Sequence, residues 1–226
     1  MSILDLIFPK TCLGCRKEGR YLCDNCLAKV KLLKPACPYC EKASIDGFTH
    51  AKCKKKYGLD GLTSVWDYEG VVKKAIMALK YKYSTEVGKE LSDRFILSLK
   101  SPNSRFLIPN SSVLVPIPIY WHRENVRGFN QSVEIGKLVA EELGLRFVPD
   151  LLIKIKSTIP QATLSVADRK QNLKDVFSLN PTYIQYTIPN ILVFDDVFTT
   201  GSTLKEAAKV LKRARVEKVW GLTIAR

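Results

Sequence analysis

The sequence predicts an α/β protein with a small metal-binding domain at its amino-terminal end. Strand-like and helix-like apolar runs alternate over most of the chain, and all seven cysteines lie before residue 54. The run at residues 191–194 is apolar without alternation, which is typical of a parallel strand covered on both faces. We therefore expect a mainly parallel, twisted sheet with helices on both faces.

The composition of the 226-residue chain changes near residue 57. Residues 1–56 hold few apolar clusters, so we expect a small zinc-ribbon domain whose folding depends on metal binding. Residues 57–226 are predicted to form the α/β domain, and residues 150–180 fit its alternation least well. Strands are expected near 62–68, 113–118, 146–149, 190–195 and 218–224, and helices near 70–80, 86–99, 131–143 and 203–214.

The cysteines are spaced as ligands of structural zinc. Three Cys-x-x-Cys pairs and one His-x-x-Cys pair follow one another, and each pair supplies half of a tetrahedral site. The sequence therefore predicts two zinc ions. Sequential pairing is the simplest arrangement, while interleaved pairing stays open. Under sequential pairing the ligands are Cys12, Cys15, Cys23 and Cys26 for the first ion, and Cys37, Cys40, His50 and Cys53 for the second.

Other uses of the cysteines agree less well with the pattern. Residues 37–40 read Cys-Pro-Tyr-Cys, which is also a dithiol redox motif, but the surrounding strand–helix pattern of a redox protein is lacking. Disulfides would leave one cysteine over and need an oxidising compartment. Residues 3–8 are too short for a secretory signal, and no apolar run reaches membrane-spanning length. We expect a cytoplasmic protein without a membrane span.

Two carboxylates, Asp195 and Asp196, and a hydroxyl-rich turn follow the strand at 191–194. The apolar spacing at 204–211 predicts a helix directly after the turn. The turn then lies at the carboxyl end of a strand and the amino end of a helix, where backbone N–H groups hold an anion. The candidate phosphate-binding residues in the turn are Thr199, Thr200, Gly201, Ser202 and Thr203.

The carboxylates beside this turn indicate a ribose 5-phosphate as ligand. Asp195 and Asp196 accept hydrogen bonds from a pair of sugar hydroxyls, and they are the candidate catalytic residues. We expect both carboxylates to face solvent and to add little to stability. A nucleoside triphosphate loop of the Walker type is excluded because it needs two glycines and a lysine, and this turn has one glycine and no lysine.

A second loop carries two arginines. Residues 113–118 read Val-Leu-Val-Pro-Ile-Pro and predict a strand, and a helix is expected from 131 to 143. Arg123 and Arg127 therefore lie on a strand-to-helix loop, where α/β sheets bind ligands. Because a guanidinium group matches the geometry of phosphate oxygens, these arginines are candidates for binding a pyrophosphate. A solvated basic turn is the alternative interpretation.

The motifs together resemble two known patterns. Residues 191–203 resemble the phosphoribosyl-diphosphate (PRPP) loop of type I phosphoribosyltransferases throughout its length. The order VPIP, RGFNQS, QATLS and FDDVFTTGST resembles the ComF family of competence-associated, phosphoribosyltransferase-like proteins, and members of that family have a double zinc ribbon. The resemblance implies a type I phosphoribosyltransferase fold, a pyrophosphate loop that contains Arg123, Arg127 and Gly128, and a hood at about 150–180 that contains Gln161, Arg169 and Asn172.

Net charge indicates polyanionic ligands. The formal charge of +14 falls to about +11 when two zinc ions bind seven thiolates, and such a field attracts PRPP and nucleic acid. Lys52 and the run at 54–56 flank the last cysteine, and a second basic run lies at 205–218. We favour the first run as a DNA contact, because a solvated helix face explains the second equally well. Tyr39, Phe48 and Tyr57 are candidates for stacking unpaired bases, or for the core of the small domain.

Two functions fit these features. In the first, the protein binds PRPP or ribose 5-phosphate with Mg²⁺ and handles incoming single-stranded DNA during natural transformation. In the second, it is a metabolic transferase that joins phosphoribose to a nucleobase or amine and releases pyrophosphate. The resemblance and the zinc ribbons favour the first function, with a DNA-uptake helicase or channel as further partners and the inner face of the membrane as a place of action. Whether catalysis occurs, the acceptor and the oligomeric state are not predicted.

Overall fold

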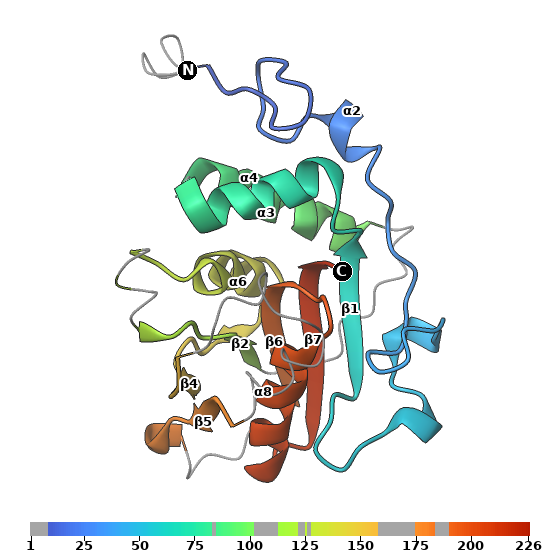
Figure 1. Cartoon of the computed structure of the whole chain (residues 1–226), viewed down its shortest axis with the longest axis vertical. Helices are drawn as coiled ribbons and strands as arrows, with labels where there is room; N and C mark the ends of the chain where they lie inside the picture. Colours follow the sequence, from blue (N-terminus) through green and yellow to red (C-terminus); the bar gives the residue numbers. More distant parts are fainter. Residues whose placement is uncertain are drawn as a thin grey trace.

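The computed structural model describes residues 9–82, 85–101, 113–121, 125, 128–157, 175–183 and 190–226. Its centre is a parallel sheet of five strands in the order β1-β7-β6-β2-β3 (Figure 1). The strands are β1 Gly61–Trp66, β2 Val113–Pro116, β3 Arg146–Phe147, β6 Asn190–Val197 and β7 Lys218–Ala225. The mainly parallel α/β fold that the sequence predicts is confirmed.

Four long helices connect the strands of the sheet. They are α3 Gly70–Lys82, α4 Thr85–Lys100, α6 Gln131–Glu142 and α8 Ser202–Arg213, and each agrees with a predicted helix to within two residues. The short helix α2 spans Asp24–Leu27, and single 3-10 turns lie at Ile45–Gly47, Ala51–Cys53 and Pro181–Tyr183.

The surroundings of strand β6 explain why its apolar residues do not alternate with polar ones. Leu192 and Phe194 belong to the apolar cluster that includes residues of α3, α4 and α6. Ile191 and Val193 belong to the cluster that includes the apolar side of α8. Because helices cover the sheet on both faces, successive apolar residues of β6 are all buried, as the sequence predicts.

The connections that follow β2 and β6 diverge to opposite sides of the sheet. The chain leaves β2 through α6 and returns on one side as β3, whereas it leaves β6 through α8 and returns on the other side as β7. Since β2 and β6 are neighbours and run parallel, their carboxyl ends form a topological switch point. Open α/β sheets bind ligands at such points.

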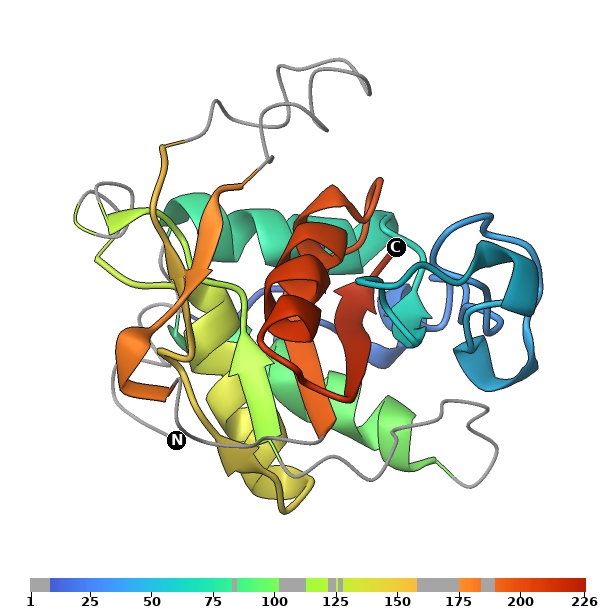
Figure 2. The same cartoon turned by 90° about the horizontal axis from the view of Figure 1, so that it is seen from below.

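A two-stranded antiparallel sheet lies within residues 150–180, the segment that fits the alternation of strands and helices least well. It consists of β4 Leu152–Lys154 and β5 Phe177–Leu179, and Leu152 and Phe177 join the same cluster as α8. These strands and the segment at residues 35–57 lie on opposite sides of the main sheet in both views (Figures 1 and 2). The hood residues Gln161, Arg169 and Asn172 lie outside the described residues.

The amino-terminal segment forms two separate lobes. The first lobe, residues 9–28, packs against α3 and α4, and its Cys12 and Leu22 belong to the same apolar cluster as these helices. The side-chain carboxylate of Glu90 in α4 accepts hydrogen bonds from the backbone N–H groups of Tyr21 (3.1 Å) and Leu22 (2.8 Å). The first lobe is therefore joined to the α/β part by a shared core and by polar contacts.

The segment after the first lobe runs along the outer edge of β1. Leu32 forms an antiparallel bridge with Trp66, and the N–H of Leu33 donates to the carbonyl of Val65 at 2.8 Å. The second lobe, residues 35–57, continues this edge, because Phe48 bridges antiparallel to Gly61. The segment after the first lobe and the second lobe thus cover an edge that would otherwise be open to pairing with another chain. The boundary near residue 57 stays a prediction. In the described part of the chain, no helix has the length and apolar character needed to cross a membrane.

Candidate functional site

The loop between β6 and α8 has the local structure that the sequence predicts. Strand β6 ends at Val197 and α8 begins at Ser202, so the loop joins the carboxyl end of a strand to the amino end of a 12-residue helix. The hydroxyl groups of Thr200 and Ser202 are hydrogen-bonded at 2.8 Å, and Thr199 is exposed. The N–H of Ser202 donates to Oγ1 of Thr200 at 3.4 Å, so the amino end of α8 lies beside these hydroxyls, which is a favourable arrangement for a phosphate.

Gly201 is required at this turn for two reasons. It is the N-cap of α8 with φ +67°, a conformation that costs other residues energy. A Cβ at this position would also overlap the ring of Phe198, which is 1% exposed and fills the space below the turn. The glycine therefore allows the loop to close over a buried aromatic ring.

We expect Gly201→Ala to destabilise the protein more than Gly144→Ala does. Gly144 has φ +64°, and no atom lies within 4 Å of the place that a Cβ would occupy, so its change costs only the backbone term, about 1 kcal/mol. Gly201→Ala adds overpacking against Phe198, for a further ~1–3 kcal/mol. Urea unfolding of the two variants measures this difference. Equal losses would show that the ring does not constrain the turn.

The two carboxylates at the end of β6 have different surroundings. Asp196 is buried, and its Oδ2 lies 2.7 Å from Nζ of Lys80 and accepts a hydrogen bond from Nε2 of Gln131 at 3.3 Å. Asp195 is half-buried, and its Oδ1 accepts from the hydroxyl of Ser132 (3.3 Å) and the N–H of Asp196 (2.9 Å). The prediction that both carboxylates face solvent is wrong for Asp196, because α3 reaches over the end of β6.

These surroundings change how Asp195 ionises. Burial raises the pKa of the Asp195 carboxyl, the charge of Asp196 raises it further, and Lys80 only partly offsets them, so the pKa reaches about 7. The pair therefore holds a proton more tightly near neutral pH than two exposed carboxylates would.

The loop after β2 lies at the same switch point. Gly128 has φ +81°, and Asn130 caps α6 by accepting a hydrogen bond from the N–H of Ser132 at 3.0 Å. The amide of Asn130 also donates to the carbonyl of Ile117 at 3.0 Å, which ties the start of α6 to the end of β2. Arg123 and Arg127 lie outside the described residues, and their pyrophosphate contact stays a prediction.

The zinc ligands assemble into two clusters with sequential pairing. In each cluster the ligand atoms lie within 4.8 Å of one another, which fits a tetrahedral ion. One cluster lies in the first lobe and the other in the second, so the interleaved alternative does not hold. The clusters are Cys12, Cys15, Cys23 and Cys26, and Cys37, Cys40, His50 and Cys53.

The thiol pKa values and the orientation of the histidine in these clusters favour binding of a cation. Burial raises the pKa of the Cys12 thiol, but hydrogen bonds from backbone N–H groups outweigh it and lower the pKa to about 6. Hydrogen bonding to neighbouring sulfurs raises the pKa of Cys26 to about 12. Several thiolates this close to one another therefore need a cation to balance their charge. His50 directs Nδ1 toward Cys40 (3.3 Å), while its Nε2 lies 3.0 Å from the carbonyl of Ala43. Such an outer contact orients a histidine ligand.

The second lobe contacts the loop between β6 and α8 through Tyr39 and Lys205. Lys205 in the first turn of α8 donates to the carbonyl of Thr200 at 2.7 Å. Its Nζ also lies 5.3 Å from the ring centroids of both Phe198 and Tyr39. Tyr39 stands between the zinc ligands Cys37 and Cys40, so the second lobe supports the loop directly.

Sequence reasoning missed two of these residues. Lys80 appears in the sequence as one of several lysines of α3, and only the packing of α3 over β6 brings it to the carboxylates. The sequence groups Lys205 with a solvated basic face, yet in the structure it joins the loop to Tyr39. A lysine among the apolar positions of a helix was the available signal for Lys80, since it adjoins the buried Leu79.

The clusters and the parallel sheet define the chain as an α/β protein with a double zinc ribbon. The family described as "Double zinc ribbon domain" matches residues 3–55. Over 96% of its length the chain is 28% identical to Competence protein F of Haemophilus influenzae, covering 98% of that protein. It is equally similar to the DNA utilization protein YhgH of Escherichia coli K12, at 28% identity over 96% of this chain and 98% of the relative.

A third relative comes from Bacillus subtilis. Competence protein ComFC of that bacterium is 27% identical over 93% of this chain and 86% of its own length. The resemblance to the ComF family is thereby confirmed along nearly the whole chain. Two solved structures are also similar. Glutamine PRPP amidotransferase of B. subtilis matches at TM-score 0.41 and 16% identity, over 65% of this chain and 30% of that one. Adenine phosphoribosyltransferase of Leishmania tarentolae matches at TM-score 0.35 and 14% identity, over 67% and 74%.

Proposed function

We propose that the protein binds PRPP at the carboxyl ends of β2 and β6, and that it handles single-stranded DNA during natural transformation. The observation that carries the first part is the carboxylate pair of β6 beside the amino end of α8, at the switch point of the sheet. A phosphate at the turn and a ribose at Asp195 and Asp196 together describe a ribose 5-phosphate. The names of the competence relatives support the second part.

The expected chemistry of this site is electrostatic. In phosphoribosyl transfer the bond at ribose C1 breaks as pyrophosphate leaves, so positive charge develops on the ribose and negative charge on the leaving group. Asp195 and Asp196 fix the ribose through its hydroxyls. Mg²⁺ would bind with the pyrophosphate and neutralise part of its charge.

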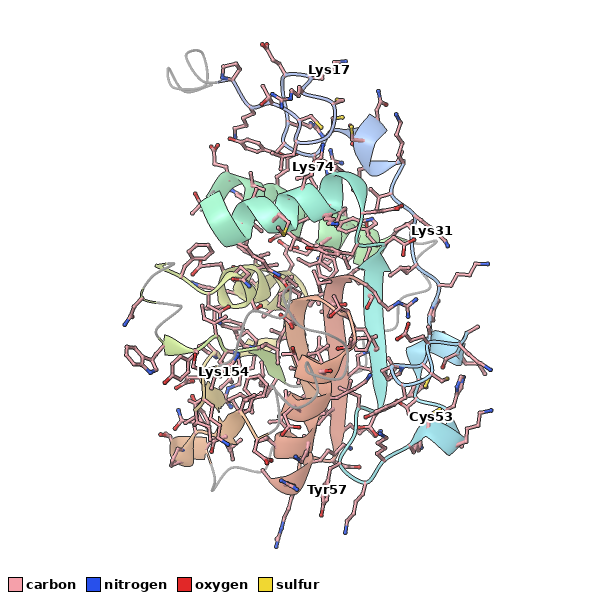
Figure 3. All side chains as sticks on the ribbon, in the orientation of Figure 1. Lys17, Lys31, Cys53, Tyr57, Lys74 and Lys154 are labelled. Carbon is pink, nitrogen blue, oxygen red and sulfur yellow. The ribbon has the colours of Figure 1, made fainter. Side chains whose placement is uncertain are left out.

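The second lobe carries the best candidate surface for DNA. Lys54, Lys55 and Lys56 are exposed beside the last zinc ligand, and Tyr57 is 38% exposed. Lys56 and Arg213 lie 5.4 and 5.6 Å from the centroid of the Tyr57 ring, so the end of α8 joins this surface. Cys53 and Tyr57 lie at the end of the molecule opposite Lys17 of the first lobe (Figure 3). An exposed aromatic ring flanked by cations is suited to an unpaired base and its phosphates.

The second basic run contributes less to this surface. Lys209 pairs with Asp175 (3.0 Å) and Glu206 (3.1 Å), and Lys212 lies 2.7 Å from Asp60. These charges are already balanced within the protein. Of the aromatic candidates, Tyr39 accepts a hydrogen bond from the N–H of Leu59, and Phe48 packs edge-on against Trp220 at 4.9 Å. Tyr57 is therefore the preferred stacking residue.

Replacing Lys54, Lys55 and Lys56 together with glutamine should weaken single-stranded DNA binding and lower its salt dependence. Each lost phosphate contact removes about 0.7 from the slope of log affinity against log salt, so the triple variant should lose about two. Fluorescence anisotropy with a labelled oligonucleotide over a salt series measures this slope. PRPP affinity should not change, because these lysines lie outside the site at β6.

The control variant removes the same charge elsewhere. Lys29, Lys31 and Lys34 are also exposed and lie on the segment beside β1. Their joint replacement should change the slope by less than half as much. Negligible DNA affinity of the wild type at physiological salt, together with rapid pyrophosphate release with one base or amine, would instead favour the metabolic transferase.

A further inference from the structure

Lys80 is held beside the carboxylate pair in a largely buried position. It lies in the last turn of α3, an element outside the two loops that the sequence singles out. Its Nζ lies 2.7 Å from Oδ2 of Asp196, and the two side chains are only 23% and 7% exposed. Lys74, one and a half turns earlier on the same helix, is exposed.

Lys80 balances part of the negative charge of the carboxylate pair. No other lysine or arginine in the described part of the chain forms an ion pair with Asp195 or Asp196. Among the described residues, Gln131 and Ser132 of α6 approach the carboxylates as neutral donors, and Tyr68 faces Lys80 from the chain before α3. Burial lowers the pKa of Lys80, but the attraction of Asp196 outweighs it, so the pKa is raised and the side chain stays charged. Lys80 therefore reduces the net negative charge at Asp195 and Asp196 before a ligand binds.

The charge matters because the expected ligand is itself strongly anionic. A buried and a half-buried carboxylate without a cation would repel a phosphorylated ribose that binds at the adjacent turn. Protonating one carboxylate would remove the repulsion, but it would also remove a charged acceptor for a ribose hydroxyl. A fixed cation beside the pair lessens both problems, because it offsets part of the negative charge and lowers the pKa of Asp195.

We propose that Lys80 is a positioning residue of the PRPP site, which holds Asp196 in place and keeps both carboxylates able to accept hydrogen bonds from ribose. This inference rests on the proposed function of that site. Lys80 engages Oδ2 of Asp196, and Ser132 engages Oδ1 of Asp195, so each carboxylate keeps its other oxygen for the ligand among the described contacts. Lys80 acts through Asp196 and does not itself contact the ligand.

Calorimetric titration with PRPP and with ribose 5-phosphate, each with Mg²⁺ between pH 5.5 and 9, tests this role. Lys80→Met and Lys80→Gln remove the charge, Lys80→Arg keeps it, and Lys74→Met is the matched control on the exposed side of α3. Because Lys80 lowers the pKa of Asp195, its removal should move the midpoint of binding to higher pH by at least one unit and weaken binding at pH 7 by about fivefold or more. Lys80→Arg should keep the wild-type midpoint, and Lys74→Met should match the wild type throughout.

A second measurement separates this role from a purely structural ion pair. Carbon-13 NMR of labelled aspartate follows the carboxyl of Asp195 without any ligand, and its titration midpoint should rise in Lys80→Met and Lys80→Gln but not in Lys80→Arg. An unchanged pH profile of binding in a folded charge-removing variant would overturn the inference while leaving the PRPP site intact. Absence of PRPP and ribose 5-phosphate binding by the wild type would overturn the proposed function, and this inference with it. If both charge-removing variants fail to fold, a shifted midpoint in Lys80→Arg would overturn it.

Discussion

Replacing Asp195 and Asp196 together with asparagine should reduce PRPP affinity by at least a hundredfold. Each carboxylate is expected to accept one charge-assisted hydrogen bond from ribose, and such bonds contribute about 1.5–3 kcal/mol each. Losing two of them corresponds to roughly 10²- to 10⁴-fold in affinity. Asparagine keeps the shape of the side chain, so the loss reports on charge. Calorimetry of the folded variants measures it.

The single variants should separate binding from stability. Asp196→Asn leaves Lys80 without its ion-pair partner in a largely buried position, so we expect a loss of about 3 kcal/mol in unfolding free energy. Asp195 has no ion pair in the described structure, so Asp195→Asn should weaken binding with little loss of stability. PRPP affinity that survives in the folded double variant would remove the carboxylate pair from the ligand site.

Loss of a zinc ligand should have different consequences in the two lobes. Structural zinc contributes on the order of 10 kcal/mol to the folding of the segment that binds it, so losing one ligand should release the ion and unfold that lobe. Cys12→Ser should uncover the apolar surface of α3 and α4, because Cys12 and Leu22 pack in the same core cluster. Cys37→Ser should release Tyr39 from Lys205 and thereby loosen the loop that contains Thr200.

The two zinc variants therefore act as controls for each other. Each should retain one zinc ion by elemental analysis, against two in the wild type. Cys37→Ser should weaken PRPP binding by tenfold or more and Cys12→Ser should weaken it less, because the second lobe contacts the loop before α8 through Tyr39 and Lys205, whereas the first lobe packs on α3 and α4. One zinc ion in the wild type, or equal PRPP affinity in both variants, would contradict the coupling.

The sequence predicts most of the fold because its signals are local. The unbroken apolar run of β6 and the periodicity of α8 each specify an element, and the glycine between them marks the turn. The spacing of the cysteines predicts two zinc sites, since each pair is a local unit. Spacing alone leaves sequential and interleaved pairing open, because that choice depends on how the chain between the pairs folds back.

The parts that sequence reasoning misses depend on tertiary contacts. Asp196 is expected in solvent because nothing in its neighbours indicates that α3 passes over the end of β6. Lys205 is grouped with a solvated face because its contact with Tyr39 joins residues far apart in the chain. The sequence predicts a small zinc-ribbon domain at residues 1–56, and local patterns do not indicate that the chain between its two lobes runs along β1. Each of these outcomes follows from packing between distant segments, which local patterns do not encode.

The most direct test of the PRPP site is calorimetric titration of the zinc-loaded wild-type protein with PRPP, with and without Mg²⁺. We predict one PRPP bound per chain, tighter with Mg²⁺, and competition by ribose 5-phosphate at the same site. We also predict that PRPP affinity falls by at least a hundredfold in the double variant of Asp195 and Asp196, in line with the loss of two charge-assisted hydrogen bonds. No saturable binding of PRPP at millimolar concentration, in protein that carries both zinc ions, would contradict the claim that the end of β6 is a ribose phosphate site.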